Sequence, residues 1–189
     1  MNDIPSPDEA LRLLKRVGCE EDIINHAIQV SKLAVKIGQA CAENGIKIDL
    51  KLVQVGGLLH DIGRSITHDV SHGVKGAEIL RSLKIPDKVV RIAEVHVGAG
   101  ISKEEAIQID LPAKDHIPTI VEEKIVCYAD KLVKKDRVMD FNEGIRDMAR
   151  SLGFNHPALL RFRKLHDEIT QFTGVKDFAG HTNRENSFR

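Results

Sequence analysis

The sequence lacks the features that mark a secreted or membrane protein. Its three cysteines, Cys19, Cys41 and Cys127, form no Cys-x-x-Cys pair, and their odd number fits no disulfide framework. No apolar run approaches the ~18 residues that a membrane span requires. Residues 1–7 contain neither the basic nor the apolar region of a signal peptide. We therefore expect a cytoplasmic protein that does not bind to a membrane.

The sequence also has no surplus of either charge. Lys and Arg together number 28, as do Asp and Glu, so the formal net charge is zero. Proteins that bind nucleic acid tightly without reading its sequence carry a basic excess. We therefore expect no strong nucleic-acid binding. Aromatic residues are scarce as well, because there is no tryptophan and only one tyrosine.

The remaining composition is that of a globular domain. Hydrophobic residues make up 42% of the 189 residues and charged residues 30%, and no shift in composition divides the chain. After Gly174 the sequence becomes polar and loses its periodicity. We predict one domain over residues 1–174 and a loosely held tail over residues 175–189.

Capping patterns and apolar spacing predict an all-α fold. Ser6 with Glu9, Ser102 with Glu105 and Thr119 with Glu122 have the spacing of capping boxes. Apolar residues recur at intervals of three and four, the period of a helix with one buried face. The predicted helices cover residues 7–16, 20–44, 50–59, 72–80, 87–95, 119–133, 142–152 and 157–172, with a short one after residue 102. Residues 110–118 have no apolar period and are the best candidate for a lid or substrate loop.

The stretch of residues 58–64 contains two adjacent side chains that bind metals, His60 and Asp61. Neighbouring helical residues point about 100° apart, so this pair could hold one ion only near a helix end. We expect Gly63 to provide that end in a left-handed conformation. By itself the pair could equally be a capped helix end with one surface charge pair.

Other histidines and acids interrupt apolar helix faces or stand at helix ends: His26, His72, His96 and Asp130. Each has an ordinary explanation. His26 could be a hydrogen-bonded core histidine, and Asp130 could pair with Lys131 or Lys134 on its own helix. His72 could be a capping-region residue, and His96 could be favoured by a helix dipole. A buried carboxylate costs several kcal/mol unless it is paired or bound to metal. A shared cation would explain all of these side chains together.

In their order along the chain, these residues resemble the HD-domain superfamily of metal-dependent phosphohydrolases, in the subgroup whose central motif reads His-Asp-Ile-Gly. The resemblance extends from Asn25 to Val133 and includes residues 58–64, His72-Gly73, His96 and residues 128–132. The chain is similar to the group that contains the symmetrical dinucleoside tetraphosphate hydrolases, and more so to uncharacterised archaeal members. The resemblance implies a compact, single-domain helical bundle.

The resemblance also implies a metal site. Its ligands would be His26, His60, Asp61 and Asp130 for one ion, with Asp61 bridging to a second ion held by His72 and His96. Mixed imidazole and carboxylate ligands suit iron, manganese, nickel or zinc better than magnesium. We expect one or two divalent ions, with iron or manganese favoured and magnesium left open.

The expected reaction is hydrolysis of a phosphate ester or anhydride of a small metabolite by a metal-activated hydroxide. Asp61 and Arg64 are the expected catalytic residues. Arg64 is also the first candidate to bind phosphate, followed by the helix start at Ser71 and Gly73, and by Lys131.

The sequence shows no aromatic pair near the motifs that could stack on a base, and Tyr128 and His116 are the only rings there. A nucleotide is therefore expected as the substrate only by analogy with the family. Two other interpretations stay open, a di-iron oxygenase with the same ligands and a non-catalytic HD sensor module. The sequence leaves the oligomeric state open.

Overall fold

Local capping sets the helix boundaries. In the computed structural model, which describes residues 3–135 and 137–179, the side chain of Ser6 accepts a hydrogen bond from the backbone N–H of Glu9, and the Glu9 side chain accepts one from Ser6. The same reciprocal pair joins Ser102 and Glu105. Both motifs satisfy N–H groups that a helix start leaves without partners. The two predicted capping boxes are therefore confirmed.

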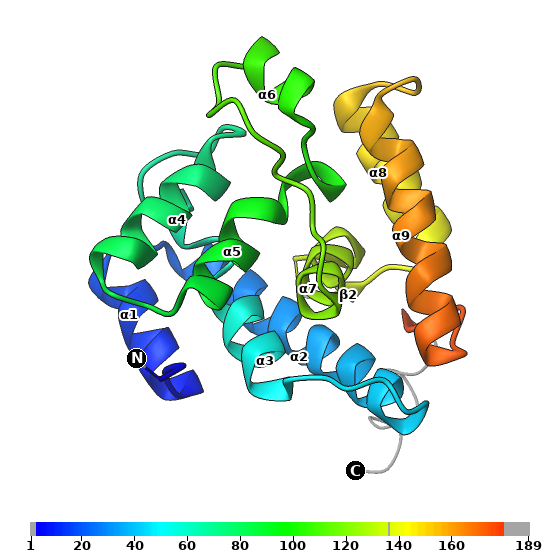
Figure 1. Cartoon of the computed structure of the whole chain (residues 1–189), viewed down its shortest axis with the longest axis horizontal. Coiled ribbons are helices and arrows are strands. Elements are labelled where there is room, and N and C mark those ends of the chain that lie inside the picture. The colour runs from blue at the N-terminus through cyan, green and yellow to red at the C-terminus, as the bar shows by residue number, and fades with distance from the viewer. Residues whose placement is uncertain (1–2, 136, 180–189) are drawn as a thin grey trace.

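The described residues form nine α-helices, two short 3-10 helices and one small hairpin (Figure 1). The all-α prediction is confirmed. The elements in chain order are α1 (Pro7–Arg16), α2 (Glu21–Glu43), α3 (Leu50–Leu59), η1 (Ile62–Ser65), α4 (His72–Ser82), α5 (Asp87–Val95), η2 (Val97–Ala99), α6 (Lys103–Gln108), α7 (Val121–Leu132), β1 (Val133–Lys134), β2 (Arg137–Val138), α8 (Phe141–Leu152) and α9 (Pro157–Thr173).

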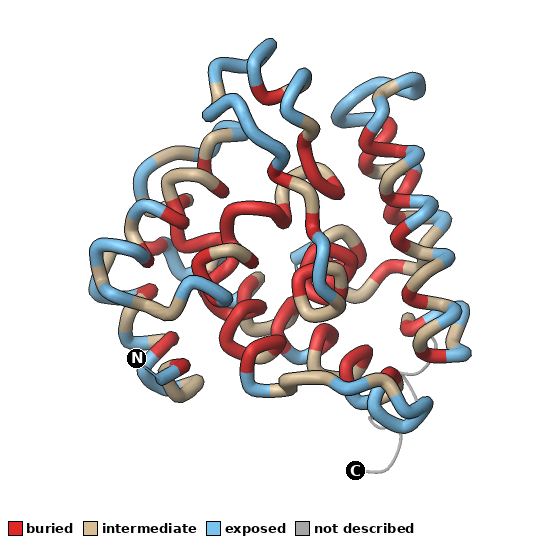
Figure 2. Tube along the Cα trace, in the orientation of Figure 1, coloured by how far each residue is buried: buried red, intermediate tan, exposed pale blue. Residues whose placement is uncertain are grey.

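Helix α7 lies in the middle of the bundle. It contacts α2, α3 and α5 on one side and α8 and α9 on the other, as the end-on view of α7 in Figure 1 shows. Its residues Ile125, Val126 and Leu132 are almost fully buried, and the buried segments in Figure 2 face inward around it. Burial of these apolar surfaces is the main stabilising contribution to such a bundle. None of the helices in the described ranges combines the length and apolar character needed to cross a bilayer.

Two details around α7 differ from the sequence prediction. The predicted Thr119–Glu122 capping box is wrong, because Ile120 is the N-cap and Thr119 donates its N–H and hydroxyl to Glu123. The helix also ends at Leu132, where Val133 adopts an extended conformation and starts the β1–β2 hairpin. The sequence carries no sign of this hairpin, because two strands of two residues each are too short to show a period.

The chain continues to pack beyond the last helix. Gly174 ends α9 in the left-handed conformation, which favours glycine. After it, Phe178 is buried in the main hydrophobic core and Val175 packs against that core. The predicted loose tail thus begins within a packed segment. Residues 180–189 lie outside the described part of the chain, and the domain boundary at residue 174 stays a prediction.

Candidate metal centre

Six side chains from five helices or their ends meet beside α7. Helix α2 contributes His26, the end of α3 contributes His60 and Asp61, and α7 contributes Asp130. The first residue of α4 is His72, and His96 follows α5. The structure thus brings together all six residues that the sequence singled out: His26, His60, Asp61, His72, His96 and Asp130.

Backbone carbonyls fix the orientation of three imidazoles. The Nδ1 atom of each lies close to the carbonyl oxygen of the residue three positions earlier. The distance is 2.8 Å for His60, 2.6 Å for His72 and 2.8 Å for His96. A carbonyl only accepts hydrogen bonds, so each Nδ1 carries the proton. In a neutral imidazole the opposite nitrogen, Nε2, then has a free lone pair. All three Nε2 atoms therefore face the cluster as electron-pair donors.

Asp61 lies between two pairs of these histidines. Its Oδ1 is 3.3 Å from Nε2 of His72 and 3.3 Å from Nε2 of His96. Its Oδ2 is 3.6 Å from Nε2 of His60 and 4.0 Å from Nε2 of His26. One carboxylate thus presents one oxygen to each pair, as a ligand that bridges two ions would.

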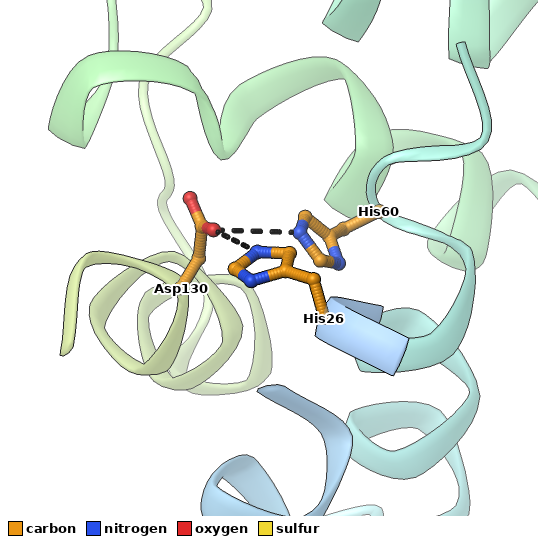
Figure 3. Close-up of side chains that lie close together, drawn as sticks. All are labelled: His26, His60 and Asp130. Carbon is orange, nitrogen blue, oxygen red and sulfur yellow. Dashed lines mark hydrogen bonds and ion pairs between the residues drawn. The ribbon is translucent and has the colours of Figure 1, made fainter. Parts of the chain in front are cut away.

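Asp130 closes the side of the cluster formed by His26 and His60. Its Oδ1 is 3.0 Å from Nε2 of His26 and 3.5 Å from Nε2 of His60, and Figure 3 shows both imidazoles pointing toward this oxygen. Its Oδ2 accepts from the ammonium group of Lys131. His26, His60 and Asp130 therefore form a compact set of two nitrogens and one oxygen that could hold a metal ion.

The chemistry of these donors fits divalent cations. Within the described residues, Nε2 of His60 and Oδ1 of Asp61 are buried and have no hydrogen-bond partner. The Nε2 atoms of His72 and His96 are only 3.1 Å apart, although both Nδ1 atoms hold the protons. Such unsatisfied groups are costly in a protein interior. Cations would satisfy them, and mixed nitrogen and oxygen ligands suit first-row transition metals.

The electrostatics keep the carboxylates ionised and one imidazole neutral. Burial by itself would raise the pKa of Asp61, but the imidazoles of His60, His72 and His96 hold it well below its usual range. Burial likewise opposes ionisation of Asp130, but the charge of Lys131 and the contact with His26 keep its pKa well below normal. Burial lowers the pKa of His96 to about 4. Burial disfavours the charged form of His60, but Asp61 and Asp130 raise its pKa, so a metal ion would bind here by displacing that proton.

Gly63 is required at this site for a reason other than the expected one. It is absent from the glycines with positive φ, so the predicted left-handed helix end is wrong. A Cβ atom at Gly63 would instead lie 1.9 Å from the carbonyl oxygen of His72 and 2.5 Å from the backbone nitrogen of Gly76. The missing side chain therefore lets α4 pack directly on η1, which places His72 opposite Asp61.

The four residues predicted to bind substrate have different surroundings. Arg64 donates from Nε to Oδ2 of Asp61 at 2.8 Å, and Lys131 contacts Asp130. The N–H and hydroxyl of Ser71 both donate to the carboxylate of Asp69. A Cβ atom at Gly73 would lie 2.8 Å from Val97, so this glycine allows α4 to approach the segment after α5. Their roles toward a substrate stay predictions.

A cavity of about 320 Å³ opens beside the centre. One wall contains Arg64, His72, Asp130 and Lys131. Another part of the wall is one face of α8, formed by Gly144, Asp147, Met148, Ser151 and Leu152. These α8 residues were not predicted as part of the site. Their spacing of three and four is visible in the sequence, but it indicates only a helix face and not what that face borders.

Tyr128, His116 and the predicted lid at residues 110–118 lie outside the lining of this cavity. The hydroxyl of Tyr128 lies 2.7 Å from Nδ1 of His166 on α9. His116 is buried beside Glu94 of α5, and Lys114 forms an ion pair with the same Glu94. Residues 110–118 are thereby fastened to α5 and contribute nothing to the cavity wall.

Comparison with known proteins agrees with this architecture. The HD domain family matches residues 23–134. An uncharacterized protein of Methanocaldococcus jannaschii is 46% identical over 86% of this chain and 95% of its own length. A tRNA (cytidine(56)-2'-O)-methyltransferase of Picrophilus torridus is 42% identical over 90% of this chain, and a Ribonuclease Y of Acetivibrio thermocellus is 31% identical over 72%. The matches cover only 48% and 27% of these two relatives.

The HD domain of the L. monocytogenes phosphodiesterase PgpH has a similar fold. It superposes with a TM-score of 0.50 at 19% identity, covering 86% of this chain and 97% of that domain. The same domain in complex with cyclic-di-AMP gives the same TM-score at 22% identity. Membership of the HD family supports divalent metal binding and metal-dependent phosphohydrolase activity. With a family match over most of its length and the matching histidines and aspartates at one centre, the chain belongs to the HD-domain family.

Proposed function

We propose that this protein hydrolyses a phosphate ester or anhydride of a nucleotide at a centre of one or two divalent cations. The ligands would be His26, His60, Asp61, His72, His96 and Asp130. The observation that carries the proposal is the position of Asp61, whose two oxygens face two separate pairs of imidazole nitrogens. When bound, the cations would stabilise charge on the phosphoryl oxygens and activate a water molecule. We expect iron or manganese in preference to magnesium, nickel or zinc.

The side chains around the ligands have defined roles in this proposal. Asp61 and Asp130 stay ionised because their pKa values lie well below the usual range. Arg64 orients Asp61 through the Nε hydrogen bond, and its guanidinium also lines the cavity. Lys131 lines the same cavity beside Asp130. Two cationic groups next to a metal centre favour a phosphorylated substrate, because both can stabilise its negative charge.

The α4 start is a weaker part of the phosphate site. Ser71 already donates its N–H and hydroxyl to Asp69, so a phosphate could take these donors only by displacing that carboxylate. Gly73 would act by keeping α4 close to its neighbours. We therefore assign phosphate binding first to Arg64 and Lys131.

The relatives support a nucleotide as the substrate. The HD domain of PgpH, a phosphodiesterase, was solved with the dinucleotide cyclic-di-AMP. Ribonuclease Y is named for cleavage of RNA, and the Picrophilus relative is named for modification of tRNA. These names describe those proteins, and they share nucleotide-containing substrates or ligands. A nucleotide is therefore the first substrate class to test here.

Two specific features favour this function over the alternatives. The cations Arg64 and Lys131 line the cavity at the centre, which suits a phosphate better than molecular oxygen and so argues against a di-iron oxygenase. All six donors face one centre, which argues against a module that has lost catalysis. Oxygen consumption by an iron-loaded sample would favour the oxygenase, and absence of metal binding would favour the module.

The decisive experiment combines metal analysis with a substrate screen. Protein loaded with Fe²⁺, Mn²⁺, Mg²⁺, Ni²⁺ or Zn²⁺ is assayed for phosphate release or diester cleavage on nucleotides, dinucleoside polyphosphates and sugar phosphates. We expect metal-dependent turnover of a nucleotide, and an Asp61→Asn variant should lose both metal and turnover. Asp167→Asn is the matched control, because it neutralises an exposed carboxylate on α9. Turnover that persists without metal, or in Asp61→Asn, would contradict the proposal.

A further inference from the structure

One face of α8 borders the metal centre without being part of it. Gly144, Asp147, Met148, Ser151 and Leu152 follow one another at intervals of three, one, three and one, so they form a single stripe along the helix. All five line the same cavity as His72 and Asp130. We call them the α8 stripe. A ligand that fills this cavity touches both the α8 stripe and the centre.

Gly144 explains why α8 can lie so close to the centre. A Cβ atom at this position would be 3.0 Å from the carbonyl oxygen of Lys131 and 3.0 Å from Leu132. The missing side chain lets α8 approach the last turn of α7, immediately after Asp130. The start of the α8 stripe is therefore fixed next to the proposed ligands by backbone packing.

The two parts of the cavity wall offer different charged groups. The wall at the centre contains both cations of the lining, Arg64 and Lys131, where a phosphate would be stabilised, together with the carboxylates Asp69 and Asp130. The α8 stripe instead carries a carboxylate, Asp147, and a hydroxyl, Ser151, one helical turn apart. A carboxylate repels phosphate but accepts hydrogen bonds from hydroxyl groups, as the acidic residue that binds ribose does in dinucleotide-binding folds.

The carboxylate of Asp147 is held in place and keeps an oxygen for a ligand. Lys134, on strand β1, contacts its Oδ1. This contact leaves Oδ2 of Asp147 to accept from a hydroxyl group. Because Lys134 belongs to the β1–β2 hairpin, which directly follows α7, the hairpin also helps to fix α8 relative to the centre.

Apolar side chains supply a further part of the lining, beside the polar residues His68 and Asp69. Met139, Met148, Leu152 and Val70 all line the cavity, and methionine side chains adapt to flat ligands of different shapes. Its volume of about 320 Å³ is at the lower end of the roughly 300–1,000 Å³ found for small-ligand sites. The cavity is thus suited to enclose one sugar phosphate with its base, and not a dinucleotide.

We propose that the α8 stripe is a ribose subsite that selects a ribonucleoside phosphate over its deoxy counterpart. The inference rests on the proposed function and names its substrate class. Asp147 and Ser151 bind the ribose hydroxyls, the phosphate lies toward Arg64 and Lys131, and the base packs on the apolar side chains. The Asp147 side chain is 37% exposed, so loss of one ribose hydroxyl removes one hydrogen bond to a partly hydrated carboxylate, and discrimination of about tenfold is expected.

The test compares ribonucleoside 5'-monophosphates with their 2'-deoxy counterparts in two assays. Dissociation constants are measured by calorimetry on EDTA-treated protein, which isolates binding from turnover. Values of kcat/KM are measured with Mn²⁺. We expect the ribonucleotide to be favoured about tenfold in wild type. The ratio should fall close to one in Asp147→Asn and decrease in Ser151→Ala, whereas the control Asp167→Asn should keep it.

The outcomes separate this inference from the proposed function. Equal treatment of ribo and deoxy nucleotides in both assays would overturn the ribose subsite, even when metal-dependent turnover of nucleotides is present. An unchanged ratio in both Asp147→Asn and Ser151→Ala would overturn it too. Ribose-dependent binding that Asp147→Asn abolishes, in a protein with no turnover on any substrate, would uphold the subsite and contradict the proposed reaction.

Discussion

Replacement of Gly63 by alanine tests whether backbone packing, and not the ligand side chains alone, builds the metal centre. The new Cβ atom would lie 1.9 Å from the carbonyl oxygen of His72, whereas ordinary contacts begin at 3.4 Å. Helix α4 would therefore have to retreat by about 1.5 Å, because a backbone atom cannot turn aside as a flexible side chain can.

The expected loss of unfolding free energy follows from this displacement. Overpacking of a core costs about 1–3 kcal/mol. Because the new Cβ atom would meet backbone atoms, we expect Gly63→Ala to cost about 3 kcal/mol. For a chain of this size, that loss corresponds to a decrease in Tm of about 6–12 °C. His72 begins α4, and its Nε2 is 3.3 Å from Oδ1 of Asp61. A shift of about 1.5 Å exceeds the tolerance of metal–nitrogen bonds of about 2.1 Å, so metal content should fall as well.

Thermal unfolding by circular dichroism and metal quantification by mass spectrometry measure the two effects. Gly38→Ala is the matched control, since it also adds one methyl group to a buried helical glycine. There the Cβ atom would meet the end of the Leu50 side chain at 2.9 Å, which can move, so Tm should change little or rise. If Gly63→Ala kept both the wild-type Tm and the wild-type metal content, the packing argument would be refuted.

Three further results are expected. Arg64→Ala should weaken metal binding about tenfold or more in calorimetry, since Arg64 orients Asp61; unchanged affinity would leave it only a phosphate-binding role. Saturating Mn²⁺ at about 100 times its Kd should raise Tm by about 5–11 °C, and no shift with any divalent ion would argue against a metal site. Burial lowers the pKa of His96 to about 4 in the folded protein, whereas the pKa of a histidine in an unfolded chain is near 6.5. As pH falls, His96 therefore takes up its proton in the unfolded chain before it does so in the folded protein. Metal-free protein should thus lose up to about 3 kcal/mol of stability between pH 6.5 and pH 4 in urea unfolding, and His96→Gln should lack this loss.

Local signals in the sequence were sufficient for most of the helices. The Ser6 and Ser102 capping boxes are contacts over three residues, and the structure contains both. The predicted start and end of α5 agree with the structure as well. The Thr119 prediction was wrong because Glu123 is also within reach of Thr119, and Glu123 pairs with Arg91 of α5. Spacing alone could not choose between the two acids.

The sequence by itself determined which side chains are expensive to bury, and so it singled out the six histidines and aspartates before their positions were known. Only the tertiary structure decided that they meet at one centre, that Gly63 serves close packing, that Arg64 holds Asp61, and that α8 lines the adjoining cavity. The physical reason is distance along the chain. Caps and apolar periods depend on residues three or four apart, whereas the partner of a buried group depends on which helices meet.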